Sequence, residues 1–340
     1  MSPVGSLTSN LRPWWITDDL GESRDTMAIA FTFPGQGSQH VGMGKALADA
    51  FAPARAVFAE VDAALGDNLS ERMWSGSEAE LTLTENAQPA LMAVSMAVMR
   101  TLEAEYGVAV TAASFVAGHS LGEYSALTAA GSFSIADGAR LLRARGRAMQ
   151  QATPVGTGAM AALLGLDIGE ASEVARTAAQ GEICQAANDN APGQVVVSGH
   201  RAAVERAIGL AKEKGAKRAI LLPVSAPFHC ILMKPAATAM AGELERVGVA
   251  APAVPLVANV TAAATREPDE IRRLLVEQVT GTVRWRETIV EMARRGVTAF
   301  YELGAGKVLT GLARRIAPDA TATALGSPED IASAIPALKP

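Results

Sequence analysis

The 340-residue sequence has too few cysteines and histidines for a disulfide framework or a clustered metal centre, and no apolar run long enough for a membrane span. It contains only two cysteines, Cys184 and Cys230, and four histidines. Neither a disulfide-rich fold nor a clustered zinc site can be assembled from so few ligands. The strongest apolar run, residues 89–99, is shorter than the roughly 18 residues that a membrane helix needs. We therefore expect a soluble protein in a reducing, cytoplasmic setting, with no bound metal and no membrane partner.

The charge and the apolar content of the chain exclude further classes of protein. The chain carries 30 Lys and Arg against 35 Asp and Glu, a net charge of −5, which argues against a dedicated nucleic-acid binder. Hydrophobic residues make up 49% and charged residues 19%, which excludes a disordered chain. The length predicts two domains, or one large domain with an insertion.

The pattern of apolar residues predicts two kinds of sheet. Strands at 27–33 and 113–117 alternate with helices at 44–65, 89–105 and 134–151, which indicates a parallel sheet. From residue 158 the order becomes strand, helix, strand, strand, helix, strand, typical of a ferredoxin-like module. Strands at 256–260 and 298–303 then return to the first sheet. We expect a main domain of residues 27–152 and 226–320, an inserted subdomain at 153–225 covering one edge of it, an extension at 1–26 and a tail at 321–340.

A nucleophile motif lies where the second strand meets a helix. Residues 118–122 read Gly-His-Ser-Leu-Gly and fit G-x-S-x-G. Its glycines allow a sharp turn that projects the Ser120 hydroxyl, with the Leu121 amide directed at a developing oxyanion. The bare pattern also occurs in turns with no chemistry, but the strand before it and the helix after it favour a nucleophile.

A serine nucleophile needs a base, and the candidates are His40, His119, His200 and His229. His119 precedes the serine, so its side chain should point away from the nucleophile. His229 follows Ser120 in the chain and lies where the insert rejoins the main domain. It is the best candidate, and a capped or core histidine is the alternative.

Arg145 is the most informative residue for the substrate. Helical spacing places it on the apolar stripe with Leu141, Leu142 and Met149, whereas Arg140, Arg143 and Arg147 share the opposite, solvated face. An inward guanidinium needs an anion, because an unpaired buried charge is costly. A substrate carboxylate and a structural salt bridge with a buried Asp or Glu are equally compatible with the spacing.

The Gly-rich loop at residues 33–39, Phe-Pro-Gly-Gln-Gly-Ser-Gln, follows the first strand. It lacks the Lys-Ser/Thr of a P-loop and the spacing of a dinucleotide fingerprint. It can instead donate the Gln36 backbone amide to an oxyanion, or be no more than a tight turn.

Taken together, these motifs resemble the malonyl-CoA:acyl carrier protein transacylases. The similarity runs from about residue 27 to 315. It also includes Phe228-His229 with Met233-Lys234-Pro235, Asn188 with residues 192–196, and Gly304 with residues 306–309. The resemblance implies an α/β fold, with an α/β-hydrolase-like parallel-sheet domain and an inserted ferredoxin-like subdomain.

The resemblance also implies a role for each site residue. Ser120 corresponds to the acylated nucleophile, His229 to its base and Arg145 to the residue that binds the malonyl carboxylate. The Gln36 and Leu121 amides correspond to the oxyanion donors, and the Gln278 backbone carbonyl orients the histidine. Phe228, before the histidine, accompanies malonyl rather than methylmalonyl selection in related domains.

The implied reaction is ping-pong transfer from malonyl-CoA to the phosphopantetheine thiol carried by acyl carrier protein, with no bound cofactor. We expect a monomer that supplies fatty-acid synthesis. Residues 272–315 hold nine Lys and Arg against four Glu, a basic segment suited to an acidic carrier. The alternatives are a serine thioesterase or esterase, an acyltransferase of a specialised polyketide pathway, and a non-catalytic carrier-binding protein.

Overall fold

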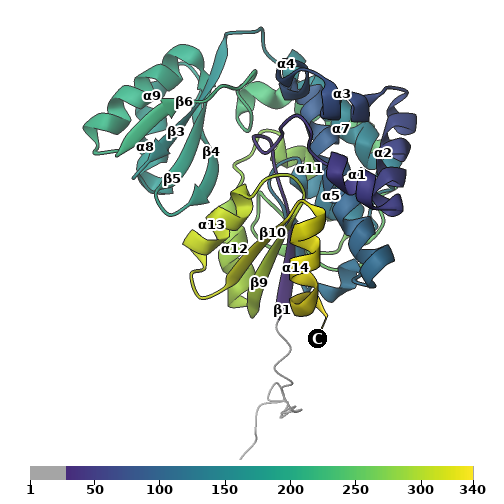
Figure 1. The fold of residues 1–340 in the computed structure, drawn as a ribbon. Helices are drawn as coiled ribbons and strands as arrows, with labels where there is room; N and C mark the ends of the chain where they lie inside the picture. Colours follow the sequence, from purple (N-terminus) through teal and green to yellow (C-terminus); the bar gives the residue numbers. More distant parts are fainter. Residues whose placement is uncertain (1–27, 340) are drawn as a thin grey trace, which may run out of the picture.

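The computed structural model describes residues 28–339, which build a larger α/β domain and a smaller inserted subdomain (Figure 1). The main sheet has six strands in the order β10-β9-β1-β2-β7-β8. Neighbouring strands are parallel except for β8, which runs antiparallel to β7. The strands are β1 (Ala28–Phe33), β2 (Phe115–Gly118), β7 (Leu256–Val257), β8 (Ala264–Thr265), β9 (Val297–Leu303) and β10 (Thr321–Leu325).

Helices cover both faces of this sheet. Alternate side chains of β1 face opposite ways, so Phe31 and Phe33 enter one core and Ala30 the other. The first core is covered by α1 (Lys45–Ala50), α2 (Ala52–Leu65), α3 (Leu69–Ser75), α4 (Glu78–Thr82), α5 (Thr84–Tyr106), α6 (Gly122–Ala129), α7 (Ile135–Gln151), α10 (Lys234–Glu245), α11 (Pro268–Gln278) and α14 (Pro328–Leu338). The second core is covered by α12 (Trp285–Arg294) and α13 (Val308–Ile316). Two short 3-10 helices, η1 (Val110–Ala112) and η2 (Ile231–Met233), lie in the connections.

The inserted subdomain has its own antiparallel sheet and its own core. Its strand order is β4-β5-β3-β6, and its two helices pack on one face. The α/β architecture with a ferredoxin-like insert is confirmed. The elements are β3 (Gly158–Leu164), α8 (Ile168–Ala179), β4 (Cys184–Ala191), β5 (Gln194–His200), α9 (Arg201–Glu213) and β6 (Arg218–Leu221).

Strand β4 attaches the insert to the main domain through backbone and charge contacts. The Asp189 amide donates to the Val283 carbonyl at 2.9 Å, and the Val283 amide donates to the Ala187 carbonyl at 2.9 Å. The buried Asp189 carboxylate also pairs with Arg286 of α12 at 2.8 Å. These contacts hold β4 in place beside the carboxyl ends of β1 and β2.

Three expectations are wrong. Residues 321–338 are not a tail, because β10 pairs with β9 and Ile331 of α14 is buried in the main core. The helix expected at 44–65 is two helices, since extended backbone at Phe51 separates α1 from α2. Arg143 is not on a solvated face: it is 8% exposed and bonded to Asp67.

Two further expectations concern the chain ends and the membrane. The extension expected at residues 1–26 lies outside the described residues. Within residues 28–339, no helix combines the length and the apolar character that crossing a bilayer requires.

Candidate active site

The G-x-S-x-G motif forms a tight elbow between β2 and α6. Ser120 has a φ of 54°, in the left-handed region. A Cβ on Gly118 would lie 1.8 Å from the Gly122 carbonyl oxygen, and one on Gly122 would lie 2.2 Å from that of Phe33. Only glycine fits either position, so the sequence pattern follows from the close approach of the backbone. The Asn259 side chain fixes the turn by accepting from the Ser120 amide at 2.8 Å and donating to the Gly118 carbonyl at 2.7 Å.

Ser120 and His229 are hydrogen-bonded in the way that a nucleophile and its base would be. Ser120 Oγ lies 2.7 Å from His229 Nε2, and His229 Nδ1 lies 2.8 Å from the Gln278 backbone oxygen. A carbonyl can only accept, so Nδ1 carries the proton and Nε2 is free to accept from the serine hydroxyl. Burial, assisted by the charge of Arg145, lowers the pKa of His229 to about 3. The imidazole is therefore neutral, as a general base must be, throughout the physiological pH range.

Arg145 is buried beside the nucleophile, with 1% of its surface exposed. Its Nη1 donates to Gln88 Oε1 at 2.8 Å, and its Nη2 donates to Gln278 Oε1 at 2.8 Å and to Ser120 Oγ at 3.1 Å. The guanidinium also lies over the Tyr124 ring, 5.6 Å from the centroid. All of these partners are uncharged, and within the described part of the chain Arg145 makes no direct ion pair. The salt bridge that the spacing left open is thus not formed, and the cation can receive an anion.

The site opens into a cavity of about 1010 Å³ between the main domain and the insert. Its lining includes the polar side chains of Ser120, His229 and Arg145 and the apolar side chains of Met149, Met160, Val196 and Leu222. Phe228 is mostly buried and lines the same space. The volume is at the upper end of the range for small-molecule sites, which suits a long, narrow ligand with a polar end.

The two backbone amides expected to bind an oxyanion belong to Gln36 and Leu121. Leu121 is the residue before α6, where amide groups and the helix dipole favour negative charge. Gln36 follows β1 and lines the cavity, with its side chain held by a hydrogen bond from Thr84 at 3.0 Å. Among residues 28–339, neither the Gln36 amide nor the Leu121 amide donates a hydrogen bond, so both remain available to a ligand.

The Gln278 side chain connects the site groups, and sequence reasoning did not find it. Its Oε1 accepts from Arg145, while its Nε2 donates to the Ser120 carbonyl at 2.8 Å and to Glu123 Oε2 at 2.6 Å. Gln88 was missed as well. The only signal for it was a polar side chain within the buried helix α5.

The other histidines are engaged elsewhere. His119 Nε2 lies 2.8 Å from Asn190 Oδ1 of the insert, and its ring packs against Trp285. His200 Nδ1 accepts from the Ile183 amide at 2.9 Å. His40 lies near the Ser38 carbonyl at 3.5 Å. His229 is thus the histidine that is bonded to the nucleophile.

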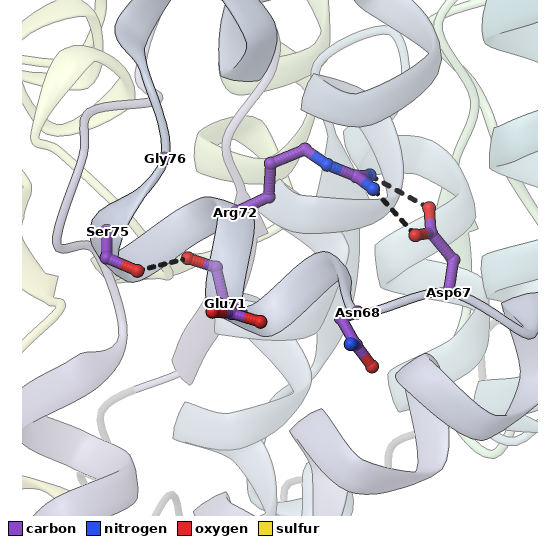
Figure 2. A pocket seen from close by; sticks show the side chains of 6 residues that line it. All are labelled: Asp67, Asn68, Glu71, Arg72, Ser75 and Gly76. Carbon is purple, nitrogen blue, oxygen red and sulfur yellow. Dashed lines mark hydrogen bonds and ion pairs between the residues drawn. The ribbon is translucent and has the colours of Figure 1, made fainter.

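A second, smaller hollow of about 370 Å³ lies at the loop between α2 and α3 (Figure 2). Its main feature is a bidentate ion pair in which Arg72 donates to both oxygens of Asp67, at 2.6 and 2.8 Å. The cation there is already neutralised by the protein. This hollow has no hydrogen-bonded serine and histidine among its lining residues, whereas Ser120 and His229 line the larger cavity.

Comparison with known proteins agrees with this geometry. The family model described as "Acyl transferase domain" matches residues 30–326, most of the chain. The malonyl CoA-acyl carrier protein transacylase of Escherichia coli K12 is 47% identical over 307 residues, covering 90% of this chain and 98% of that protein. The chain belongs to the malonyl-CoA:acyl carrier protein transacylase family.

Solved structures of this transacylase family have the same fold. The acyl-carrier-protein S-malonyltransferase of Bartonella henselae superposes with a TM-score of 0.90 at 57% identity, covering 92% of this chain and 99% of that one. A malonyl-transacylase in complex with a type II polyketide synthase acyl-carrier protein gives a TM-score of 0.88 at 43% identity, covering 91% and 99%. The family model matches this chain as far as residue 326, so the matched region includes β10. This agrees with the position of β10 in the main sheet.

Proposed function

We propose that this protein transfers a malonyl group from malonyl-CoA to the phosphopantetheine thiol of acyl carrier protein, supplying fatty-acid synthesis. One observation carries the substrate assignment: a buried guanidinium without a carboxylate partner lies 3.1 Å from the nucleophile oxygen. A malonyl thioester has its carboxylate one carbon beyond the carbonyl that Ser120 attacks. Paired planar hydrogen bonds from Arg145 would hold that carboxylate and orient the thioester.

In the first half-reaction Ser120 Oγ attacks the thioester carbonyl as His229 Nε2 takes its proton. The Gln36 and Leu121 amides bind the oxyanion of the tetrahedral intermediate. When the intermediate collapses, the carbon–sulfur bond breaks, and the leaving thiolate of coenzyme A takes the proton from His229. A malonyl-serine ester remains, with the Gln278 carbonyl holding the imidazole in position.

The second half-reaction reverses these steps with a different thiol. The carrier's thiol gives its proton to His229 and attacks the ester carbonyl, and the same amides bind the oxyanion. Collapse breaks the ester bond, and Ser120 recovers its proton from His229. Arg145 holds the malonyl group throughout, while Phe228 narrows the acyl end of the cavity and favours malonyl over branched acyl groups.

The carrier protein is the proposed partner, and the basic segment at 272–315 gives weaker support than its composition predicts. Five of its nine cations form ion pairs with nearby carboxylates: Arg273, Arg284, Arg286, Arg294 and Arg295. We also propose that the protein acts as a monomer in the cytoplasm. The free, buried thiols Cys184 and Cys230 suit a reducing compartment.

Intact-mass measurement tests the proposed function. After mixing with malonyl-CoA the wild-type chain should gain one malonyl group and lose it when holo-acyl carrier protein is added. Ser120→Ala should gain none. Ser125→Ala, which removes another buried serine hydroxyl on α6, should behave as wild type. Release of free malonate without carrier would identify a thioesterase, and absence of any adduct with carrier binding retained would identify a binding protein.

A further inference from the structure

Glu123 is a buried carboxyl group that the reaction steps above do not use. It is the second residue of α6, three residues after the nucleophile, and 1% of its surface is exposed. Its Oε2 accepts from Gln278 Nε2 at 2.6 Å. A carboxyl group is almost never so buried without a charged partner. Yet within residues 28–339 no cation contacts it directly.

The nearest compensating charge lies across a single amide group. Gln278 accepts from Arg145 through Oε1 at 2.8 Å and donates to Glu123 through Nε2. The two charged groups are thus bound to opposite ends of one side-chain amide. When Glu123 is ionised, this arrangement balances the charge of Arg145 at a distance while the guanidinium still lines the cavity beside Ser120.

A substrate carboxylate on Arg145 changes this balance. Two anions would then share one buried cation, and two like charges in a low-dielectric site disfavour each other's ionised form. The substrate acid is strong and directly bonded to the guanidinium, whereas Glu123 is one amide farther away. Glu123 is therefore the group that holds a proton in the loaded site and takes one up wherever it is ionised before the substrate binds.

We infer that Glu123 is a specificity-determining positioning residue: its carboxyl group stays protonated while an acyl carboxylate lies on Arg145, and in the empty site it ionises at alkaline pH and then balances the guanidinium through Gln278. The inference rests on the proposed function. The proton comes from solvent, and no covalent bond other than the O–H bond forms. Because such coupling is reciprocal, protonated Glu123 favours carboxylated acyl groups and ionised Glu123 disfavours them.

The surroundings of Glu123 make this exchange measurable. Of the elements packed against α6, β1 and β2 carry no ionisable side chain, the charged residues of α5 are confined to its two ends, and α7 contributes Arg145. Tyr124 is the ionisable neighbour on α6 itself, and burial raises its pKa to about 12, so it stays neutral. Burial raises the pKa of Glu123 to about 8, whereas His229 stays neutral above pH 6.

The test compares malonyl-CoA with acetyl-CoA between pH 6 and pH 9. Rapid-quench mass spectrometry of the full chain gives the second-order rate constant for each acyl adduct, and the ratio of the two cancels the titration of coenzyme A and of the base. In the wild type the malonyl-to-acetyl ratio should fall about fivefold between pH 6 and pH 9, as expected when substrate binding raises the pKa of Glu123 from about 8 by about one unit. In Glu123→Gln the ratio should be constant.

Glu302→Gln is the matched control. Glu302 is also 1% exposed and hydrogen-bonded, but it accepts from Leu309 and Thr310 at the start of α13. This variant should lose stability and keep the wild-type pH dependence of the ratio. A constant ratio in the wild type would overturn the inference even if Glu123→Gln does not fold, and so would a pH dependence that survives in Glu123→Gln. Failure of the wild type to form any malonyl adduct would instead overturn the proposed function.

Discussion

Arg143 and Arg145 are two residues apart on α7 and both are buried, yet their partners differ. Arg143 donates to Asp67 at 3.2 Å, and Asp67 is also bound by Arg72 (Figure 2). Arg145 is bound by uncharged oxygens of Gln88, Gln278 and Ser120. One cation is neutralised by a carboxylate of the protein, and the other is positioned by neutral groups. The difference is the reason we propose Arg145, and not Arg143, as the arginine that binds the substrate carboxylate.

The largest effect should come from removing the unpaired cation. Arg145→Ala should lower kcat/KM for malonyl transfer about 10²–10³-fold, because two charge-assisted hydrogen bonds to the carboxylate, about 3–4 kcal/mol, are lost. Adduct formation with acetyl-CoA, which has no carboxylate, should fall less than tenfold. Steady-state and single-turnover rates with both thioesters measure this.

Arg143→Ala is the matched control for that substitution. It removes a guanidinium from the same helix and should lower stability while leaving the malonyl preference unchanged. Equal losses with malonyl-CoA and acetyl-CoA in Arg145→Ala would show that the guanidinium does not recognise the carboxylate.

A smaller effect, on stability, should follow from removing the charge of Asp67, the carboxylate that pairs with Arg143 and Arg72. Asp67 has a pKa lowered from 3.8 to about 2, chiefly by its hydrogen bond from Arg72. A carboxyl group with a depressed pKa stabilises the fold above its ordinary pKa, and that contribution is lost as the pH falls through about 2. Because Asp67 is partly exposed to solvent, we expect Asp67→Asn to lower the free energy of unfolding by about 1 kcal/mol at pH 7.

Denaturant titrations at several pH values measure this contribution. The difference between wild type and Asp67→Asn should shrink as the pH falls from about 4 toward 2, where Asp67 is about half protonated in the folded chain. Asp49→Asn breaks the exposed pair with Lys45 and should change stability by no more than a few tenths of a kcal/mol. A difference at Asp67 that is independent of pH would mean that packing, rather than charge, accounts for it.

Local patterns predicted the parts of the molecule that depend on neighbours in sequence. The Ser134 hydroxyl caps α7 by accepting from the Asp137 amide at 3.0 Å, and the apolar stripe of that helix directs Arg145 inward. The elbow was predictable because its two glycines and the serine between them form a short local pattern, although the backbone that excludes a side chain at Gly122 is that of Phe33, far away in sequence.

Partners that come from distant parts of the chain could not be predicted in this way. The Gln278 side chain meets Arg145 and Glu123 across separations of 133 and 155 residues, and nothing in its local sequence marks it. Arg143 was misassigned because its partner, Asp67, lies 76 residues away. The last strand was missed because its pairing with β9 is a tertiary contact.

The most direct test of the account is a crystal structure of Ser120→Ala with malonyl-CoA. The account predicts that the terminal carboxylate oxygens lie within hydrogen-bond distance of the Arg145 guanidinium and that the thioester carbonyl carbon faces the position of the missing hydroxyl. A bound molecule whose carboxylate points away from Arg145, toward the mouth of the cavity or into solvent, would contradict it.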